Sequence, residues 1–379
     1  MKIGINALYL LPGKVGGSET YIRNLVKCFA KSRDDNVFVV FINKESVGIF
    51  EELSPHIEVV LCPFSASHRA VRILWEQFLL PFQVWQHKIE ILFSAGMTSP
   101  FLCSVTTVLV IHDLQHVNQP ENYSSVYLCF LRMIVYLSAK TADKVVTISE
   151  KVKADIIKFY KIAAENIYIT YNAVDHNAFS PRDSNEVETI RKKYRLPEKF
   201  VLYAASSLPH KNHIRLFEAM KIIRQEGRGM KLVLVGARFK WSDVIVAKIE
   251  EMGIKDDVIF IGWVPFEDLP LIYCASEIFV FPSLHEGFGI PVLEAMACGV
   301  PVVCSNIEPI TEVAAGAAFL VDPLDPRAIA RALCTVAQDR VIRENLITLG
   351  FCRAAEFSWE ATARKTIDCL LSRREADNV

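Results

Sequence analysis

Two carboxylates stand in an otherwise apolar segment of this sequence, HEGFGIPVLEAMACGVPVV, which runs from residue 285 to residue 303. They are Glu286 and Glu294, and seven residues separate them. FVFPS before the loop HEGFG is a predicted strand, and PVLEAMACG after it is a predicted helix with proline in its first turn and glycine at its end. Glu286 is then in the loop at the strand's carboxyl end, and Glu294 lies one turn into the helix. Buried carboxylates need partners, so both are candidates to hold ligand hydroxyls.

The backbone between the two acids is a candidate phosphate site. The amides of Phe288, Gly289 and Ile290 are predicted near the helix start, where N–H groups and the helix dipole favour an anion. The alternative is structural, with Glu294 capping its own helix and Glu286 a solvated loop residue. The apolar residues on both sides of the loop favour the ligand-binding interpretation.

A glycine pair follows the first predicted strand. Gly16 and Gly17 in KVGGSETYIRNL precede a predicted helix that is capped by Ser18 and carries Glu19 in its first turn. Glycines let backbone amides approach a ligand closely, and a helix N-terminus favours an anion. The spacing is not G-x-G-x-x-G, so a plain strand-to-helix turn is the alternative.

Two basic side chains also follow predicted strands, where an open sheet displays its functional groups. His112 in VLVIHDLQH can donate to a sugar hydroxyl or a phosphate, with Asp113 orienting its ring. Lys211 in SSLPHKNHIRLF lies just before a predicted helix, and a cation there suits a diphosphate. The alternatives are a loop histidine satisfied by backbone and a solvated lysine.

The elements that must position these residues alternate along the whole chain. Thirteen short apolar runs rich in β-branched residues are separated by amphipathic stretches, which predicts an α/β architecture with parallel sheets covered on both faces. The pattern restarts at Phe200 after a polar, turn-rich segment near residues 172–186, which predicts a domain boundary. Ligands bind beyond the carboxyl ends of such strands, and two facing sheets would form a cleft.

Composition limits the class of protein. The chain has 379 residues, of which 51% are hydrophobic, and a formal net charge of -1, so no overall field attracts nucleic acid. Its ten cysteines are scattered without metal-site spacing, which predicts reduced thiols in a cytoplasmic protein. The apolar start is a predicted first strand rather than a signal peptide, and no stretch predicts a transmembrane helix.

HEGFGIPVLEAMACGVPVVCSN resembles the signature of the family-four retaining glycosyltransferases, the glycogen-synthase-like group 1 with the GT-B fold. Matching stretches cover nearly the whole chain: the glycine pair, VIHDLQH, VTISEKVKADI, YNAVD, PHKN, GWVPFEDLPLIYCASEIFVFPS and LVDPLDPRAIA. FSWEATARKTID resembles the C-terminal helix that crosses back onto the first domain. The resemblance implies two facing Rossmann-like domains with parallel sheets, an N-terminal acceptor-side domain of residues 1–172 plus 358–379 and a nucleotide-sugar-binding domain of residues 173–357.

The resemblance also implies roles for individual residues. Glu286 would contact the hydroxyls of the donor sugar and Glu294 those of the ribose, while His112 would approach the transferred sugar. Lys211 and the loop amides would hold the diphosphate, and the backbone near Val264 would recognise the base. The implied catalytic residues are Glu286 and His112, and the implied donor-binding residues are Gly16, Gly17, Ser206, Lys211, Val264, Phe288, Gly289, Ile290 and Glu294.

The sequence departs from the family pattern near the lysine. Many members have Gly-Arg before it, with the arginine on the diphosphate, where this chain has Ala205 and Ser206. Lys211 would then carry more of the charge. Two further departures are Ala173 where glycine is common and Ala317 where aspartate is frequent.

The implied function is a metal-independent, retaining transfer of a hexose, with mannose suggested by similarity to bacterial polysaccharide mannosyltransferases. The donor would be a GDP- or UDP-sugar and the acceptor a glycan or lipid-linked glycan in polysaccharide or O-antigen-type biosynthesis. No further cofactor is implied. The alternatives are a GT-B epimerase, a phosphorylase whose pyridoxal lysine finds no supporting context, and a degenerate scaffold in a glycan-assembly complex.

A peripheral membrane contact is a further hypothesis. HRAVRILWEQFLLPFQVWQHK, residues 68–88, mixes basic and aromatic side chains as an interfacial helix does. The preferred alternative is a helix of the first domain that packs on the sheet. The predicted location is therefore cytoplasmic, with contact at the cytoplasmic face of the membrane as the second possibility.

Overall fold

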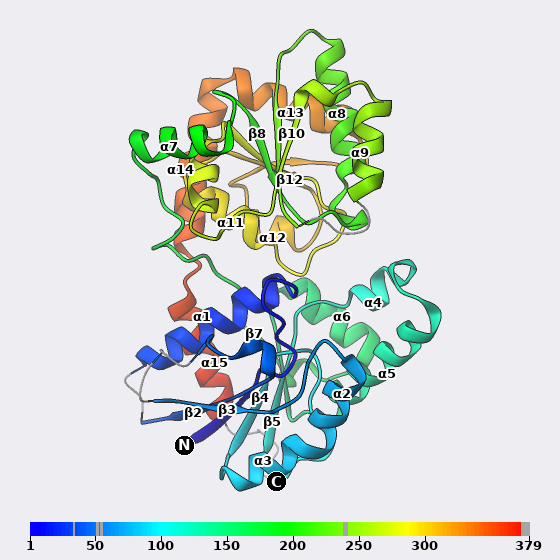
Figure 1. The fold of residues 1–379 in the computed structure, drawn as a ribbon, viewed down its shortest axis with the longest axis vertical. Coiled ribbons are helices and arrows are strands. Elements are labelled where there is room, and N and C mark those ends of the chain that lie inside the picture. The colour runs from blue at the N-terminus through cyan, green and yellow to red at the C-terminus, as the bar shows by residue number, and fades with distance from the viewer. Residues whose placement is uncertain (33–34, 51–52, 54–55, 238–241, 373–379) are drawn as a thin grey trace. The chain divides into compact units, whose positions relative to one another are not determined.

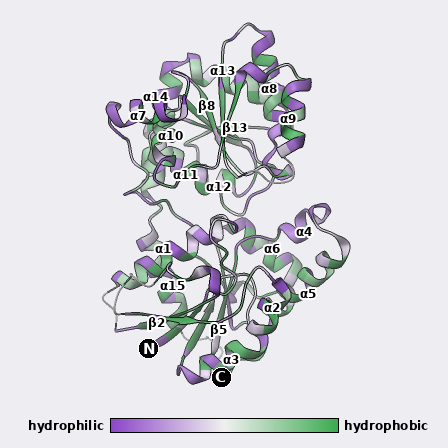
Figure 2. Ribbon diagram, in the orientation of Figure 1, coloured by the Kyte–Doolittle hydropathy of each residue, from purple (hydrophilic) through white to green (hydrophobic). Residues whose placement is uncertain are grey.

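Two wholly parallel sheets organise the computed structural model, which describes residues 1–32, 35–50, 53, 56–237 and 242–372 (Figure 1). Contacts divide the chain into a first unit, Met1–Asn172 with a C-terminal segment beginning at Trp359, and a second unit, Ala173–Ser358. Each predicted apolar run contains one strand of a sheet, and Figure 2 shows these strands as hydrophobic. Strands that are apolar on both sides suit parallel sheets covered by helices, so the predicted α/β class is confirmed.

The first unit contains a seven-stranded sheet with the order β3-β2-β1-β4-β5-β6-β7. The order reverses between β1 and β4, which makes their carboxyl ends the switch point of this sheet, the usual place for ligands. Its strands are β1 Lys2–Asn6, β2 Val37–Ile42, β3 Ile57–Leu61, β4 Ile91–Ser94, β5 Thr106–Ile111, β6 Lys144–Thr147 and β7 Ile167–Ile169. Its helices are α1 Gly17–Lys31, α2 Arg69–Leu74, α3 Leu80–Gln86, α4 Gln115–Asn118, α5 Ser125–Thr141, α6 Glu150–Tyr160 and α15 Trp359–Leu371.

The second unit contains a six-stranded sheet with the order β10-β9-β8-β11-β12-β13, so its switch point lies between β8 and β11. Figure 1 shows α8 and α9 on one side of this sheet and α7, α11 and α14 on the other. The strands are β8 Val201–Ala204, β9 Leu232–Val235, β10 Val258–Gly262, β11 Ile278–Phe281, β12 Val302–Ser305 and β13 Phe319–Val321. The helices are α7 Ser184–Tyr194, α8 His213–Gln225, α9 Ser242–Glu251, α10 Leu269–Ala275, α11 Ile290–Ala297, α12 Ile310–Ala314, α13 Pro326–Gln338 and α14 Arg340–Ala355.

The C-terminal helix α15 belongs to the first unit, as predicted. It packs against α1, and the buried Trp359 ring meets the Tyr21 ring edge-on at 6.2 Å between centroids. Lys144 Nζ on β6 donates to the Cys369 carbonyl at 2.7 Å, which ties the end of the helix to the sheet. No helix in the described ranges is long and apolar enough to cross a bilayer.

The predicted helix at residues 68–88 is interrupted. It divides into α2, a π-helical turn at Trp75–Leu79 and α3, and Leu80 N–H bonds to the Trp75 carbonyl five residues back. Pro81 has no N–H to continue the regular i→i−4 ladder, which gives the wider turn a physical reason. The predicted helix is therefore present over residues 69–86, with a π-helical turn in its middle that the sequence pattern did not indicate.

Candidate functional site

Lys211 and Glu286 meet at the switch point of the second sheet. Lys211 follows β8 and Glu286 follows β11, and Lys211 Nζ lies 2.6 Å from Glu286 Oε1. The two side chains are only 17% and 12% exposed, so Glu286 is not the solvated loop residue of the structural alternative. Lys211 Nζ also lies 5.5 Å from the centroid of the Phe281 ring, a cation–π contact. The site therefore presents an oriented cation and an oriented carboxylate side by side.

Asn212 fixes the loop that carries Lys211. It caps α8 in the left-handed region, with φ 63°, and its buried amide donates to the carbonyls of Pro282 at 2.9 Å and Pro323 at 2.7 Å. Leu284 N–H donates to the His210 carbonyl at 2.8 Å, so the loops after β8 and β11 are tied together. Sequence reasoning missed Asn212, although asparagine is one of the few residues besides glycine that adopt the left-handed region.

Glu294 contacts a tyrosine from a neighbouring helix instead of capping its own helix. Tyr273 on α10 donates its hydroxyl to Glu294 Oε2 at 2.9 Å. Burial raises the pKa of Glu294 to about 7, although part of the side chain stays accessible to solvent. The carboxyl group therefore changes between hydrogen-bond donor and pure acceptor near neutral pH.

The start of α11 has the geometry of a glycine-capped helix. Gly289 occupies the N-cap with φ 107°, a conformation that suits glycine, and Pro291 lies in the first turn as predicted. Phe288 is buried, and its ring meets the Phe357 ring edge-on at 5.8 Å. This packing fixes the backbone of the Phe288–Ile290 segment at the helix start.

The other predicted donor-binding residues of the second unit also follow strands of its sheet. Ser206 is two residues beyond β8 and is half-buried, and Val264 is two residues beyond β10 and is buried. Two buried polar atoms nearby in sequence, Ser207 Oγ and His285 Nε2, have no hydrogen-bond partner among the described residues. Such orphaned atoms call for a ligand or water, and neither residue was singled out from the sequence.

His112 is a buried histidine at the end of β5 in the first unit. Its Nε2 lies 2.9 Å from the Ala95 carbonyl oxygen, and its ring meets the Tyr21 ring edge-on at 5.0 Å. A carbonyl only accepts, so Nε2 carries the hydrogen and Nδ1 is an acceptor in the neutral ring. Burial lowers the pKa of His112, which favours this neutral form. Asp113 does not orient the ring through a hydrogen bond; its carboxylate accepts from Gln115 N–H at 3.2 Å.

The glycine pair begins α1, but Ser18 does not cap it. Gly16 is the N-cap, with φ 58°, and Gly17 is the first helical residue. The Ser18 hydroxyl instead donates to the Val15 carbonyl at 2.9 Å, because that carbonyl lies within reach in the tight loop. Glu19 in the first turn accepts from Gly13 N–H at 2.7 Å and closes the loop.

Two sequence families match the chain. Residues 15–178 match the family described as Glycosyltransferase Family 4, and residues 186–350 match Glycosyl transferases group 1. The O-antigen chain mannosyltransferase B of Escherichia coli is 34% identical over 264 residues, which are 69% of each chain. The O-antigen chain mannosyltransferase RfbU of Salmonella typhimurium is 30% identical over 250 residues, 65% of each chain.

Solved structures share the whole fold. Sucrose-phosphate synthase from Thermosynechococcus elongatus superposes with a TM-score of 0.80 at 21% identity, covering 97% of this chain and 98% of that one. WaaG, a glycosyltransferase involved in lipopolysaccharide biosynthesis, gives a TM-score of 0.76 at 17% identity, covering 98% of this chain and all of the other. These likenesses confirm the predicted GT-B architecture.

Proposed function

This chain belongs to the glycosyltransferases of group 1, and we propose that it transfers mannose to a glycan or lipid-linked glycan in O-antigen-type polysaccharide assembly. Group 1 enzymes use nucleotide-sugar donors. The mannose and O-antigen assignments are supported by the similarity to the Escherichia coli and Salmonella enzymes. The observation that carries a donor site in this chain is the Lys211–Glu286 pair at the switch point of the second sheet.

We assign each site residue a role on the donor. Lys211 holds the diphosphate with the amides of Phe288, Gly289 and Ile290, and Glu286 holds sugar hydroxyls. The ribose lies at Glu294. The backbone of Val264 contacts the base. Ser206, Gly16 and Gly17 contact the diphosphate, and His112 contacts a hydroxyl of the transferred sugar.

The ion pair suggests how the empty and loaded states differ. In the absence of a nucleotide sugar, Glu286 forms the ion pair with Lys211. In our proposal, the diphosphate of the bound nucleotide sugar takes the place of Glu286 as the partner of Lys211. Glu286 is then released toward the sugar hydroxyls. Exchange of one ionic partner for another keeps both desolvated groups paired throughout.

We further propose a retaining, metal-independent reaction. The bond between the sugar C1 and the diphosphate oxygen breaks while the acceptor oxygen bonds to C1 on the same face, and the acceptor proton moves to the leaving phosphate. Lys211 and the N-terminus of α11 stabilise the charge that develops on the diphosphate. The acceptor, in this proposal, contacts loops of the first unit that include residues 94–100 and 116–123.

Screening GDP- and UDP-sugars for binding and slow hydrolysis tests this function directly. Stabilisation and hydrolysis with one donor, GDP-mannose in our proposal, would support it. A scaffold would show no thermal shift with any nucleotide sugar. An epimerase, which the comparisons do not support, would release free nucleotide and an epimer without acceptor.

Nucleotide-sugar affinity is expected to rise between about pH 6 and about pH 8, because Glu294 ionises with a pKa of about 7 and its carboxylate accepts better from ribose hydroxyls. The folded state binds a proton that the unfolded state releases, so the Glu294 contribution to the free energy of unfolding falls as the pH rises from 4.5 to about 7. Calorimetry and thermal unfolding across this range measure both trends. The diphosphate of a nucleotide sugar does not titrate there, so Glu294→Gln should flatten the affinity trend and remove the Glu294 contribution from the stability trend. Slopes that match those of the parent protein would contradict the assignment.

We also propose a peripheral membrane contact through α2, the π-helical turn and α3. Ile73, Leu80 and Val84 are buried against the unit, as the packing alternative predicted, while the opposite stripe is open. Phe78 and Trp85 are 73% and 69% exposed. Val71, Leu74, Leu79 and Phe82 are exposed on the same segment. The only acid between residues 67 and 89 is the buried Glu76, while Arg69 and Lys88 are exposed, and such cations suit anionic lipid.

Phe78→Glu with Trp85→Glu is expected to abolish co-sedimentation with phosphatidylglycerol vesicles at low salt. Two large side chains would lose about 1.5–3 kcal/mol each of apolar burial, which lowers partitioning by more than about a hundredfold. Val341→Glu on α14, where Val341 is also exposed, is the matched control. Binding by the double variant, or no binding by the parent protein, would remove the membrane contact from the proposal.

A further inference from the structure

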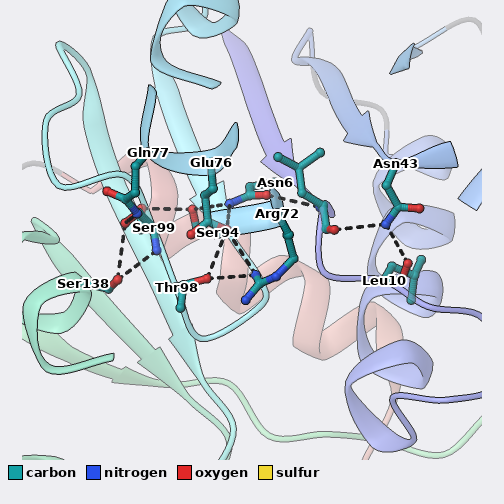
Figure 3. Close-up of polar contacts among 11 residues, drawn as sticks. Asn6, Leu10, Asn43, Arg72, Glu76, Gln77, Ser94, Thr98, Ser99 and Ser138 are labelled. Carbon is teal, nitrogen blue, oxygen red and sulfur yellow. Dashed lines mark hydrogen bonds and ion pairs between the residues drawn. The ribbon is translucent and has the colours of Figure 1, made fainter. Parts of the chain in front are cut away.

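A buried carboxylate lies at the switch point of the first sheet. Glu76 is 1% exposed and comes from the π-helical turn between α2 and α3. It forms a cluster with Asn6 at the end of β1, Ser94 at the end of β4, and two residues beside them, Arg72 and Thr98 (Figure 3). We refer to these five residues as the Glu76 cluster. None of them is among the individual site residues that the sequence predicted, although Ser94 and Thr98 belong to the loop of residues 94–100 that we assign to acceptor contact.

One oxygen of Glu76 receives three donors. Glu76 Oε2 lies 3.0 Å from Thr98 Oγ1, 3.2 Å from Asn6 Nδ2 and 3.4 Å from Arg72 Nη1. The other oxygen, Oε1, is buried without a hydrogen-bond partner among the described residues. A buried carboxylate that is only half satisfied destabilises a fold relative to an apolar residue, so stability does not explain this side chain. Buried polar groups that reduce stability are expected at functional sites.

The cluster leads to His112 through the backbone of Ala95. Asn6 Nδ2 donates to Glu76 and also to Ser94 Oγ at 3.3 Å, which joins the ends of β1 and β4. Ala95, the next residue, donates its N–H to the Asn6 carbonyl at 3.4 Å. The Ala95 carbonyl is in turn the acceptor for His112 Nε2, at 2.9 Å. Three consecutive contacts therefore connect the Glu76 carboxylate with the His112 ring.

The far side of the same loop is also held. Thr98 donates to Glu76, and Ser99 N–H donates to Ser138 Oγ on α5 at 3.1 Å. A Cβ on Gly96 would lie 2.3 Å from Tyr9 Cδ1, so the Tyr9 ring presses on the loop backbone at that residue. The segment from Ser94 to Ser99 is thus fixed at both ends, and Glu76 accepts hydrogen bonds from both Asn6 and Thr98.

From this geometry we propose that Glu76 is a positioning residue, which acts through Asn6 and Ala95 to hold His112 in the tautomer with hydrogen on Nε2. The reason is the Ala95 carbonyl, which accepts but cannot donate. If that carbonyl moves, the ring loses the partner that distinguishes its two nitrogens, and the tautomer with hydrogen on Nδ1 becomes accessible. Nδ1 is the nitrogen left for the sugar hydroxyl in the observed tautomer, and it accepts there instead of donating as the sequence suggested. In the other tautomer Nδ1 would be a donor. The proposal rests on the role assigned to His112 under the proposed function.

The test combines turnover with nitrogen NMR of the ring in the absence of donor. Histidine labelled with ¹⁵N reports the tautomer, and the His112 signals among the nine histidines are identified by their loss in His112→Ala. Glu76→Gln is expected to give a mixture of His112 tautomers and to lower turnover by about tenfold to a hundredfold, because small misplacements of catalytic groups are costly. Affinity for GDP or UDP, which lack the sugar that His112 contacts, should change little, since Lys211 and Glu286 lie in the second unit.

Thr98→Val is the second variant, and it keeps the shape of the side chain but removes one donor to Glu76. It should shift the His112 signals in the same direction by a smaller amount, and it carries the test if Glu76→Gln does not fold. Ser46→Ala, which removes the buried hydrogen bond to the Leu10 carbonyl in the same unit, is the matched control and should leave the signals unchanged.

Unchanged His112 signals and turnover in Glu76→Gln, measured at the same interval below each melting temperature, would overturn the positioning role. If the tautomer shifts and turnover does not, the cluster holds the ring but the ring does not serve the reaction. Near-normal turnover of His112→Ala would show independently that the role assigned to His112 under the proposed function is wrong.

Discussion

Replacing Glu286 with glutamine is expected to lower turnover by about a hundredfold to a thousandfold, the range seen when a charge-stabilising group of an active site is removed. Glutamine keeps the size of the side chain and can still contact hydroxyls, but it lacks the charge of the carboxylate. The backbone around it is held by the tie between Leu284 and His210, so the fold should survive. The measurement is kcat with the donor found in the nucleotide-sugar screen, with circular dichroism to verify the fold.

The same variant should separate turnover from nucleotide binding. In the structure Glu286 occupies Lys211 at 2.6 Å, and a nucleoside diphosphate must compete for that lysine. Without the competing charge, GDP or UDP should bind as tightly as before or more tightly. Glu250→Gln, on the surface of α9, is the control for loss of one negative charge. Near-normal kcat, or a parallel loss of turnover and nucleotide affinity, would contradict the role of Glu286.

Replacing Lys211 with glutamine is expected to weaken binding of the nucleoside diphosphate by about tenfold to a hundredfold, because charge-assisted hydrogen bonds contribute about 1.5–3 kcal/mol. The effect should be large here because the family arginine is absent and Ser206 stands near its place. The melting temperature should also fall, since Glu286 would keep a desolvated charge without its partner. Calorimetry with GDP and UDP, together with thermal unfolding, measures both.

Lys221→Gln is the matched control for that variant. Lys221 lies on α8, the helix that follows the Lys211 loop, and it is exposed. Lys221→Gln removes the same charge by the same substitution as Lys211→Gln. It should leave nucleotide affinity within about twofold, as expected for an isolated surface charge. Equal losses in the two lysine variants would mean that the positive charge of the unit, and not Lys211, attracts the nucleotide.

Much of the fold could be predicted because its strands are continuous apolar runs. Burial on both faces leaves a signal that a single sequence displays, and the restart at Phe200 marks the second sheet. α14 was not predicted, because its apolar residues do not form one clear stripe. Part of the helix also packs with its backbone close to a neighbouring helix. Gly350 on this helix lies against Met296, where a Cβ would be 3.2 Å from Met296 Cγ. Close packing of this kind depends on the partner helix, which a local pattern does not contain.

The candidate site shows the same division. The types of Glu286, Glu294, Lys211 and His112, and their places after strands, were available from the sequence because parallel strands bring their carboxyl ends to one edge. Their partners were not. Glu294 meets Tyr273 from another helix, and His112 meets the Ala95 carbonyl instead of the adjacent Asp113.

The architecture, the family signature and the residue types at the strand ends can therefore be inferred from the amino-acid sequence alone. The pairing of these groups cannot, because Lys211 and Glu286 are 75 residues apart and no local periodicity relates them. The same holds for Glu76, which in the sequence is one charge on an amphipathic stretch. Glu76 is buried at the switch point by the π-helical turn, by Asn6 at the end of β1 and by Thr98 in the loop after β4. These segments come together only once the sheet has formed.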